Sequence, residues 1–258
     1  MNTINPYSPL GPKIKAALDL VIASLPLNPT FDNLNDALFN ALFAGNLPSD
    51  DLVILYVKSV LPNVYNAYSK TSPSVPLLRG EGGHDGNTST GQSGNLAGGL
   101  PASGSPLLEG EGPGVRSYNE KQRLIINDVI NSLRTTSAES IPQLLTLTDE
   151  KIAASGLTIA EQAPLFVATT AGRAGSEYWL LQIPQPSAWA AYMVNPAITP
   201  QAMDALNYAN VSSWVSASMQ GALLAWGSIN LPKIEFVDMM AAYAGATGMA
   251  AGKVVFKW

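Results

Sequence analysis

Cysteine is absent from the 258-residue chain, and histidine occurs once, as His84. Without cysteine the chain has no disulfides, no thiolate nucleophile, no Fe–S cluster and no zinc site built from thiolates. A single histidine excludes His-rich metal sites and argues against a Ser–His–Asp triad. No motif in the sequence marks a catalytic residue, a metal site or a cofactor site, so none is assigned.

Charge is also scarce, at 13% of residues, with a formal net charge of −5. Binding to a nucleic-acid backbone needs clustered Lys and Arg, and no basic run occurs anywhere in the chain. We therefore expect no nucleic-acid partner.

A convincing secretory signal is missing. Lys13 and Lys15 precede the apolar run 16–25, but Asp19 interrupts that run. The large apolar residues there recur at helical intervals, which favours an amphipathic helix. The expected localisation stays open between the cytoplasm and export without a classical signal peptide.

Period-two alternation of apolar residues is absent, and most of the chain shows helical spacing. We predict an all-α multi-helix bundle with a long Gly/Pro-rich loop between two helical parts. The N-terminal helical segment (1–70) is expected to hold three helices, and the C-terminal helical body spans 117–258. The predicted helices are 12–25, 31–44, 49–70, 117–134, 140–147, 149–155, 158–171, 176–183, 187–193, 200–226 and 232–252. The tail 253–258 is expected to be more strand-like.

Two of these helices begin with a capping box. In this motif the side chain of the first residue accepts from the backbone N–H three residues later, and the side chain of that later residue accepts from the backbone N–H of the first. The pairs are Ser117 with Glu120 and Thr158 with Glu161. Arg173 and Glu177 are four residues apart, so we expect them to pair on one helix face.

The stretch 71–116 holds 12 of the 22 glycines and is read as a loop or linker. It contains a repeated phrase, PLLRGEG at 76–82 and PLLEGEG at 106–112. One interpretation is low-complexity drift. The other is a docking element used twice, with avidity from a flexible tether. Its anchors would be Leu77, Leu78, Leu107 and Leu108.

The last third of the chain is poor in charge, with Asp204 alone between Glu177 and Lys233. Small residues recur every fourth position on its two long predicted helices, which allows two backbones to approach closely. They are Ser213, Ala217, Gly221 and Ala225 on one helix, and Ala244, Gly248 and Gly252 on the other. We favour a packed helical hairpin, in the core or at a subunit interface, over a hairpin that inserts in a membrane after a trigger. The Asn, Ser and Gln residues at 207–220 would need partners in hydrocarbon.

Three functions remain open. The first is a non-enzymatic structural or interaction protein that acts by self-association (a homo-oligomer) or by binding another protein. The second is a soluble, membrane-active helical protein of the pore-forming toxin type, which would meet a membrane only after a conformational trigger. The third is an enzyme that uses Glu161, Glu177 or Asp204 as an acid, with its pKa raised in an aromatic pocket near Trp179 or Trp214.

Overall fold

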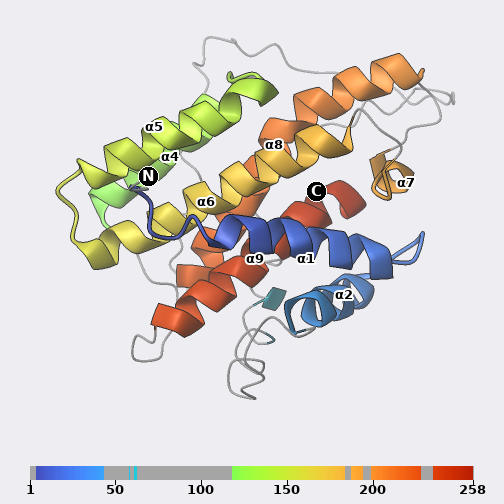
Figure 1. Ribbon diagram of the computed structural model, residues 1–258, viewed down its shortest axis with the longest axis horizontal. Helices are drawn as coiled ribbons and strands as arrows, with labels where there is room; N and C mark the ends of the chain where they lie inside the picture. The colour runs from blue at the N-terminus through green and yellow to red at the C-terminus, as the bar shows by residue number, and fades with distance from the viewer. Residues whose placement is uncertain are drawn as a thin grey trace, which may run out of the picture.

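The computed structural model describes residues 4–43, 58, 61–62, 118–183, 187–193, 199–227 and 235–257. Every regular element in these ranges is helical and none is a strand, which confirms the predicted all-α class (Figure 1). The Gly-rich stretch 71–116 and most of the predicted helix 49–70 lie outside the described residues. The helices are α1 (Leu10–Ser24), α2 (Phe31–Phe43), α4 (Glu120–Leu133), α5 (Ile141–Ala153), α6 (Ile159–Gln182), α7 (Ala190–Met193), α8 (Pro200–Gly227) and α9 (Glu235–Phe256).

Helix α9 is the centre of the fold. Every residue from Met240 to Gly252 is buried, as expected for a helix that is apolar all round. It contacts α1, α2, α6, α7 and α8, and Figure 1 shows it (red) crossing behind α1. The other long helices are thus arranged around the charge-free middle of α9, residues 239–252.

Helix α6 is covered by α1, α5 and α8. The predicted end near residue 171 is wrong, because the helix continues to Gln182 through Gly172 and Gly175. A side chain at Gly172 would come within 2.8 Å of Met219 and 3.1 Å of Leu145. Close packing of α6 against its neighbours therefore explains the glycine there better than helix termination does.

The N-terminal helices share the core of the C-terminal body. Helix α1 contacts α2, α6 and α9, and α2 also contacts α9. Ile14, Leu18 and Val21 of α1 are at most 1% exposed and belong to one hydrophobic cluster with residues of α4 to α9. The helical spacing of 12–25 thus marks a core-facing helix.

The helix starts follow capping chemistry, with one prediction confirmed and one wrong. Thr158 and Glu161 form the predicted box at the start of α6. At α4 the box is formed by Asn119 and Gln122, so the helix begins at Glu120, three residues later than predicted. Asn is as good an N-cap as Ser, which is why spacing alone selected the wrong residue.

Two further helix boundaries differ from prediction. Residues 141–153 form one helix, α5, preceded by a short 3₁₀ turn (Ala138–Ser140), where two short helices were expected. The tail is helical as far as Phe256, so the strand-like expectation is wrong there. Lys257 follows with φ of 55°, the left-handed conformation in which many helices end.

Candidate functional site

The four leucines of the repeated phrase, Leu77, Leu78, Leu107 and Leu108, lie outside the described residues. The docking interpretation of that phrase therefore stays a prediction. The small residues of the last two helices are described, and they form the first candidate site.

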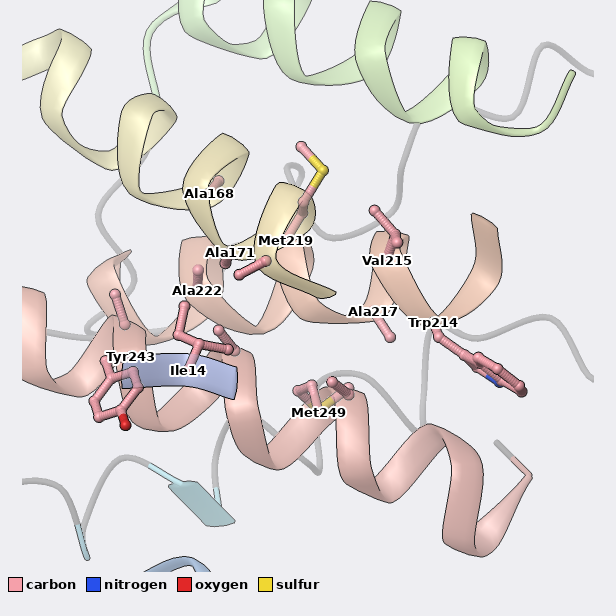
Figure 2. Close-up of a cluster of buried hydrophobic side chains, with 14 of the residues drawn as sticks. Ile14, Ala168, Ala171, Trp214, Val215, Ala217, Met219, Ala222, Tyr243 and Met249 are labelled. Carbon is pink, nitrogen blue, oxygen red and sulfur yellow. The ribbon is translucent and has the colours of Figure 1, made fainter. Parts of the chain in front are cut away.

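Helices α8 and α9 pack against each other along their lengths. On α8, Ala217 and Ala225 are fully buried, Gly221 is buried and Ser213 is half-buried. On α9, Ala244, Gly248 and Gly252 are all buried. Figure 2 shows Ala217 and Ala222 of α8 and Met249 of α9 in one buried cluster, to which α6 and α1 also contribute.

The closest approach of the two helices is between Gly221 and Gly245. A Cβ atom on Gly221 would lie 2.6 Å from Cγ of Met249 and 2.8 Å from the carbonyl carbon of Gly245. A Cβ on Gly245 would lie 2.8 Å from Cβ of Ala225. Neither position has room for a side chain, so the hairpin geometry requires glycine at both.

Sequence spacing identified Gly221 but missed Gly245. Nearly every residue from 241 to 252 is small, so several series of small residues spaced four positions apart fit that segment equally well. The series that contains Gly245, Ala241–Gly245–Met249, includes a large residue, so small-residue spacing does not mark it. The signal that singles out Gly245 is its pairing with Gly221, which only the packed hairpin reveals.

The first half of α8 has an exposed face that no other described helix covers. Ala202, Ala205, Leu206 and Ala209 are all exposed, and Leu206 retains 45% of its accessible surface. Positions separated by three, four and seven residues lie on one side of a helix. This set, the α8 face, carries no charged side chain. The exposed Asp204 lies about 100° or more around the helix from each of its members. Figure 1 shows the start of α8 at the edge of the molecule, away from α9.

An aromatic cluster lies where α6, α7 and α8 meet. Trp179 is fully buried, with its ring centroid 5.0 Å from that of Trp189 and 5.2 Å from that of Trp214 in edge-on arrangements. Its indole nitrogen has no hydrogen-bond partner among the described residues. Edge-on aromatic pairs add about 1 kcal/mol each beyond the area they bury, so the cluster stabilises this end of the bundle.

Tyr178 links this cluster to α1. The indole of Trp189 donates to the Tyr178 hydroxyl at 2.7 Å, and that hydroxyl donates to Asp19 at 2.8 Å. Burial, with the neighbouring Asp19 carboxylate adding to it, raises the pKa of Tyr178 well above its usual value. The hydroxyl is thus held neutral as a donor, which is a structural role.

The three carboxylates named as acid candidates are not enclosed with the tryptophans. Glu161 caps α6, and its hydrogen bonds from Thr158 lower its pKa, so the expected rise is wrong there. Glu177 pairs with Lys15 at 2.8 Å on the surface. Asp204 is exposed on α8.

A shallow pocket of about 340 Å³ also lacks an acid. It lies between the α1–α2 connection, α7 and the end of α9, and no carboxylate side chain lines it. Its lining residues are Leu27, Asn28, Pro29, Ala191, Tyr192, Val255, Phe256 and Lys257. The pocket therefore supplies no acid–base pair for the enzymatic interpretation.

Arg173 and Asp149 form a largely buried ion pair between α6 and α5. Arg173 of α6 binds the carboxylate of Asp149 in α5, which is 6% exposed at its side chain. The predicted partner of Arg173, Glu177, is wrong, because its carboxylate points to α1 instead. A pair between two helices cannot be read from spacing within one helix.

The described ranges carry neither a metal-binding cluster nor a membrane-spanning helix. No three His, Asp or Glu side chains there are grouped to hold a metal ion. No helix described is both long enough and apolar enough to cross a membrane.

Comparisons with known proteins give no relative for this chain. No family model, curated protein or solved structure matches it.

Proposed function

We propose that the chain is a non-enzymatic interaction protein that associates with itself through the α8 face. The observation that supports this is the exposure of Ala202, Ala205, Leu206 and Ala209 on one side of a helix without any charge. Interface cores are depleted of charged residues, and an apolar helix face that stays in water favours association.

The geometry of the face suits packing against another helix. Ala202 and Ala209 are about 10 Å apart along the axis, at 1.5 Å per residue. The half-buried Ser213 and Ser216 continue the same line of small residues toward the body. Small side chains let a second helix approach closely, and Leu206 is the one large apolar side chain to fill the contact.

A second copy of the chain is the partner that this surface suits best. The α8 face has no charge that would select an acidic or basic partner. Two copies of an uncharged face can also meet without electrostatic repulsion. A two-fold axis would place Leu206 of each copy against the alanines of the other. The face is short, so we expect a weak dimer, with a dissociation constant in about the micromolar range.

Sedimentation velocity over a range of protein concentrations tests this proposal. The wild type should shift toward a dimer with increasing concentration. Leu206→Glu should raise the dissociation constant at least about tenfold, because a carboxylate would be desolvated in the contact. Leu147→Glu is the matched control, since Leu147 is 54% exposed on α5. A wild type that stays monomeric throughout, or a Leu206→Glu variant that dimerises normally, would contradict the proposal.

Membrane insertion after a trigger is the second candidate, and the observation in its favour is the burial of α9. The segment 239–252 has no charged residue and lies within the bundle. Exposing it would require α1, α2 and α6 to move away, whereas the α8 face is accessible in the folded chain. Self-association is therefore the better supported function. Dye release from anionic vesicles over a range of pH separates the two, and intact vesicles under all conditions would exclude insertion.

A further inference from the structure

The side chain of Asn5 is inserted between α5 and α6, although Asn5 precedes the first helix. It is 2% exposed, and its amide nitrogen is 3.1 Å from Oδ1 of Asp149 and 3.0 Å from Oγ1 of Thr170. The carbonyl of Phe166 at 2.9 Å and Oγ1 of Thr169 at 3.2 Å are also within hydrogen-bond distance. These four acceptors exceed the two hydrogens of the amide, so the site is rich in acceptors and suits a neutral donor.

The Asp149 carboxylate explains why a donor is needed at this point. It is buried, and it accepts hydrogen bonds from Thr169 and Arg173 as well as from Asn5. Oδ1 of this carboxylate depends on Asn5 and Thr169 for its donors. Loss of Asn5 would leave a buried acceptor partly unsatisfied, and hydrogen bonds to charged groups are the more costly ones to lose.

Asn5 also fixes the start of α1. Its Oδ1 accepts from the backbone N–H of Tyr7 at 2.9 Å, and its carbonyl accepts from the Ser8 hydroxyl at 2.8 Å. These local bonds shape the turn that leads into Leu10. The position of Asn5 therefore determines where α1 begins on the surface of α6.

Further along α1, three polar contacts hold it to α6 and α9. The Tyr243 hydroxyl donates to the carbonyl of Lys13 at 2.6 Å, and Tyr178 donates to Asp19. The third is the surface ion pair of Lys15 with Glu177, and such exposed pairs contribute little. Only the Asn5 contacts satisfy a buried charge, so they are the strongest polar attachment of this segment, in addition to its buried apolar side chains.

We infer that residues 4–24, which lie against α6 and α9, detach from these helices as one unit. We call this segment the cover, and the Asn5 side chain is the contact that holds it in place. The cover lies on the outside of α6, and at its C-terminal end residues 25–30 connect it to α2. Its opening leaves α4, α5, α6 and α8 folded and uncovers apolar surface of α6 and α9. The α8 face is on another helix, so this inference is independent of the proposed self-association.

Hydrogen exchange measured by mass spectrometry on the full chain tests the inference. Asn5→Ala should increase exchange of the α1 amides by about 10- to 100-fold, as expected for losing bonds to a buried charge. Exchange in α4, to which Asn5 makes no hydrogen bond, should stay as in the wild type. Asn119→Ala is the matched control, because it removes an Asn side chain that caps α4, and it should affect α4 but leave α1 unchanged.

Two results would overturn the inference: unchanged exchange in α1, or an equal increase in every helix of Asn5→Ala. If that variant does not fold, the wild type is measured in increasing sub-denaturing urea. The α1 amides should then exchange together, through an opening that needs less urea than exchange of the α6 and α9 amides. Exchange of α1 only upon global unfolding would contradict a separate cover.

Discussion

Substitution of Gly221 by alanine probes the closest contact in the fold. The added methyl group would meet the backbone of Gly245 on α9 and the side chain of Met249 at 2.6 Å. The Met249 side chain can rotate away, but the carbonyl of Gly245 belongs to a helix that is buried on all sides. The two helices must therefore separate, and the packing around them must loosen.

The expected magnitude follows from two opposing effects. Overpacking a well-packed core costs about 1–3 kcal/mol, and contact with backbone places this site at the upper end. Replacing glycine by alanine inside a helix contributes about 1 kcal/mol of stability. We therefore expect Gly221→Ala to lower the free energy of unfolding by about 2 kcal/mol, the difference between about 3 and about 1.

Gly175→Ala is the matched control, because it makes the same change in the interior of α6. A Cβ there would lie 3.9 Å from Ser218, which is an ordinary contact. Only the gain in helix propensity remains, so this variant should be more stable by up to about 1 kcal/mol. Urea unfolding followed by circular dichroism measures both variants. A Gly221→Ala variant as stable as the wild type, or equal losses in both variants, would refute the proposed hairpin contact.

Two further predictions concern buried polar groups. Asp149→Asn removes the charge that Arg173 faces and leaves the guanidinium without its buried partner. The free energy of unfolding, measured in urea, should fall by about 3 kcal/mol. A fall below about 1 kcal/mol would show that water already satisfies Arg173. Burial raises the pKa of Tyr178 and Tyr243. As the pH rises, the unfolded chain therefore loses these protons before the folded chain does. The free energy of unfolding should fall above about pH 10, by up to about 1.4 kcal/mol per pH unit for each tyrosine. Unfolding measured from pH 9 to 11 checks this. Tyr178→Phe should reduce the slope, and a pH-independent midpoint would contradict the prediction.

The sequence was sufficient where a local signal marks a helix, either a single apolar face or a cap at its start. Helix α2 shows a clear stripe with Leu34, Leu38 and Leu42, and its predicted range of 31–44 differs from Phe31–Phe43 by one residue. Helix α8 was placed within one residue because Thr199 and Pro200 mark its start. In both cases the signal is local, so no knowledge of neighbouring helices was needed.

The sequence was insufficient to predict features that depend on contacts between helices. Helix α6 is buried on several sides, so its apolar residues lack a clear period that would mark where the helix ends. The partner of Arg173 is 24 residues away on another helix. Asn5 gave no signal at all, because its acceptors are more than 140 residues away in the chain. These features follow from which helices meet, and helical periodicity does not determine that.

Crosslinking of single-cysteine variants tests the proposed self-association most directly, because the chain has no cysteine of its own. Ala209→Cys places a thiol on the α8 face, and Leu147→Cys places one on an exposed position of α5 as the control. Under mild oxidation at equal concentration, Ala209→Cys should form a covalent dimer much faster than Leu147→Cys. Equal rates for the two variants would contradict association through the α8 face.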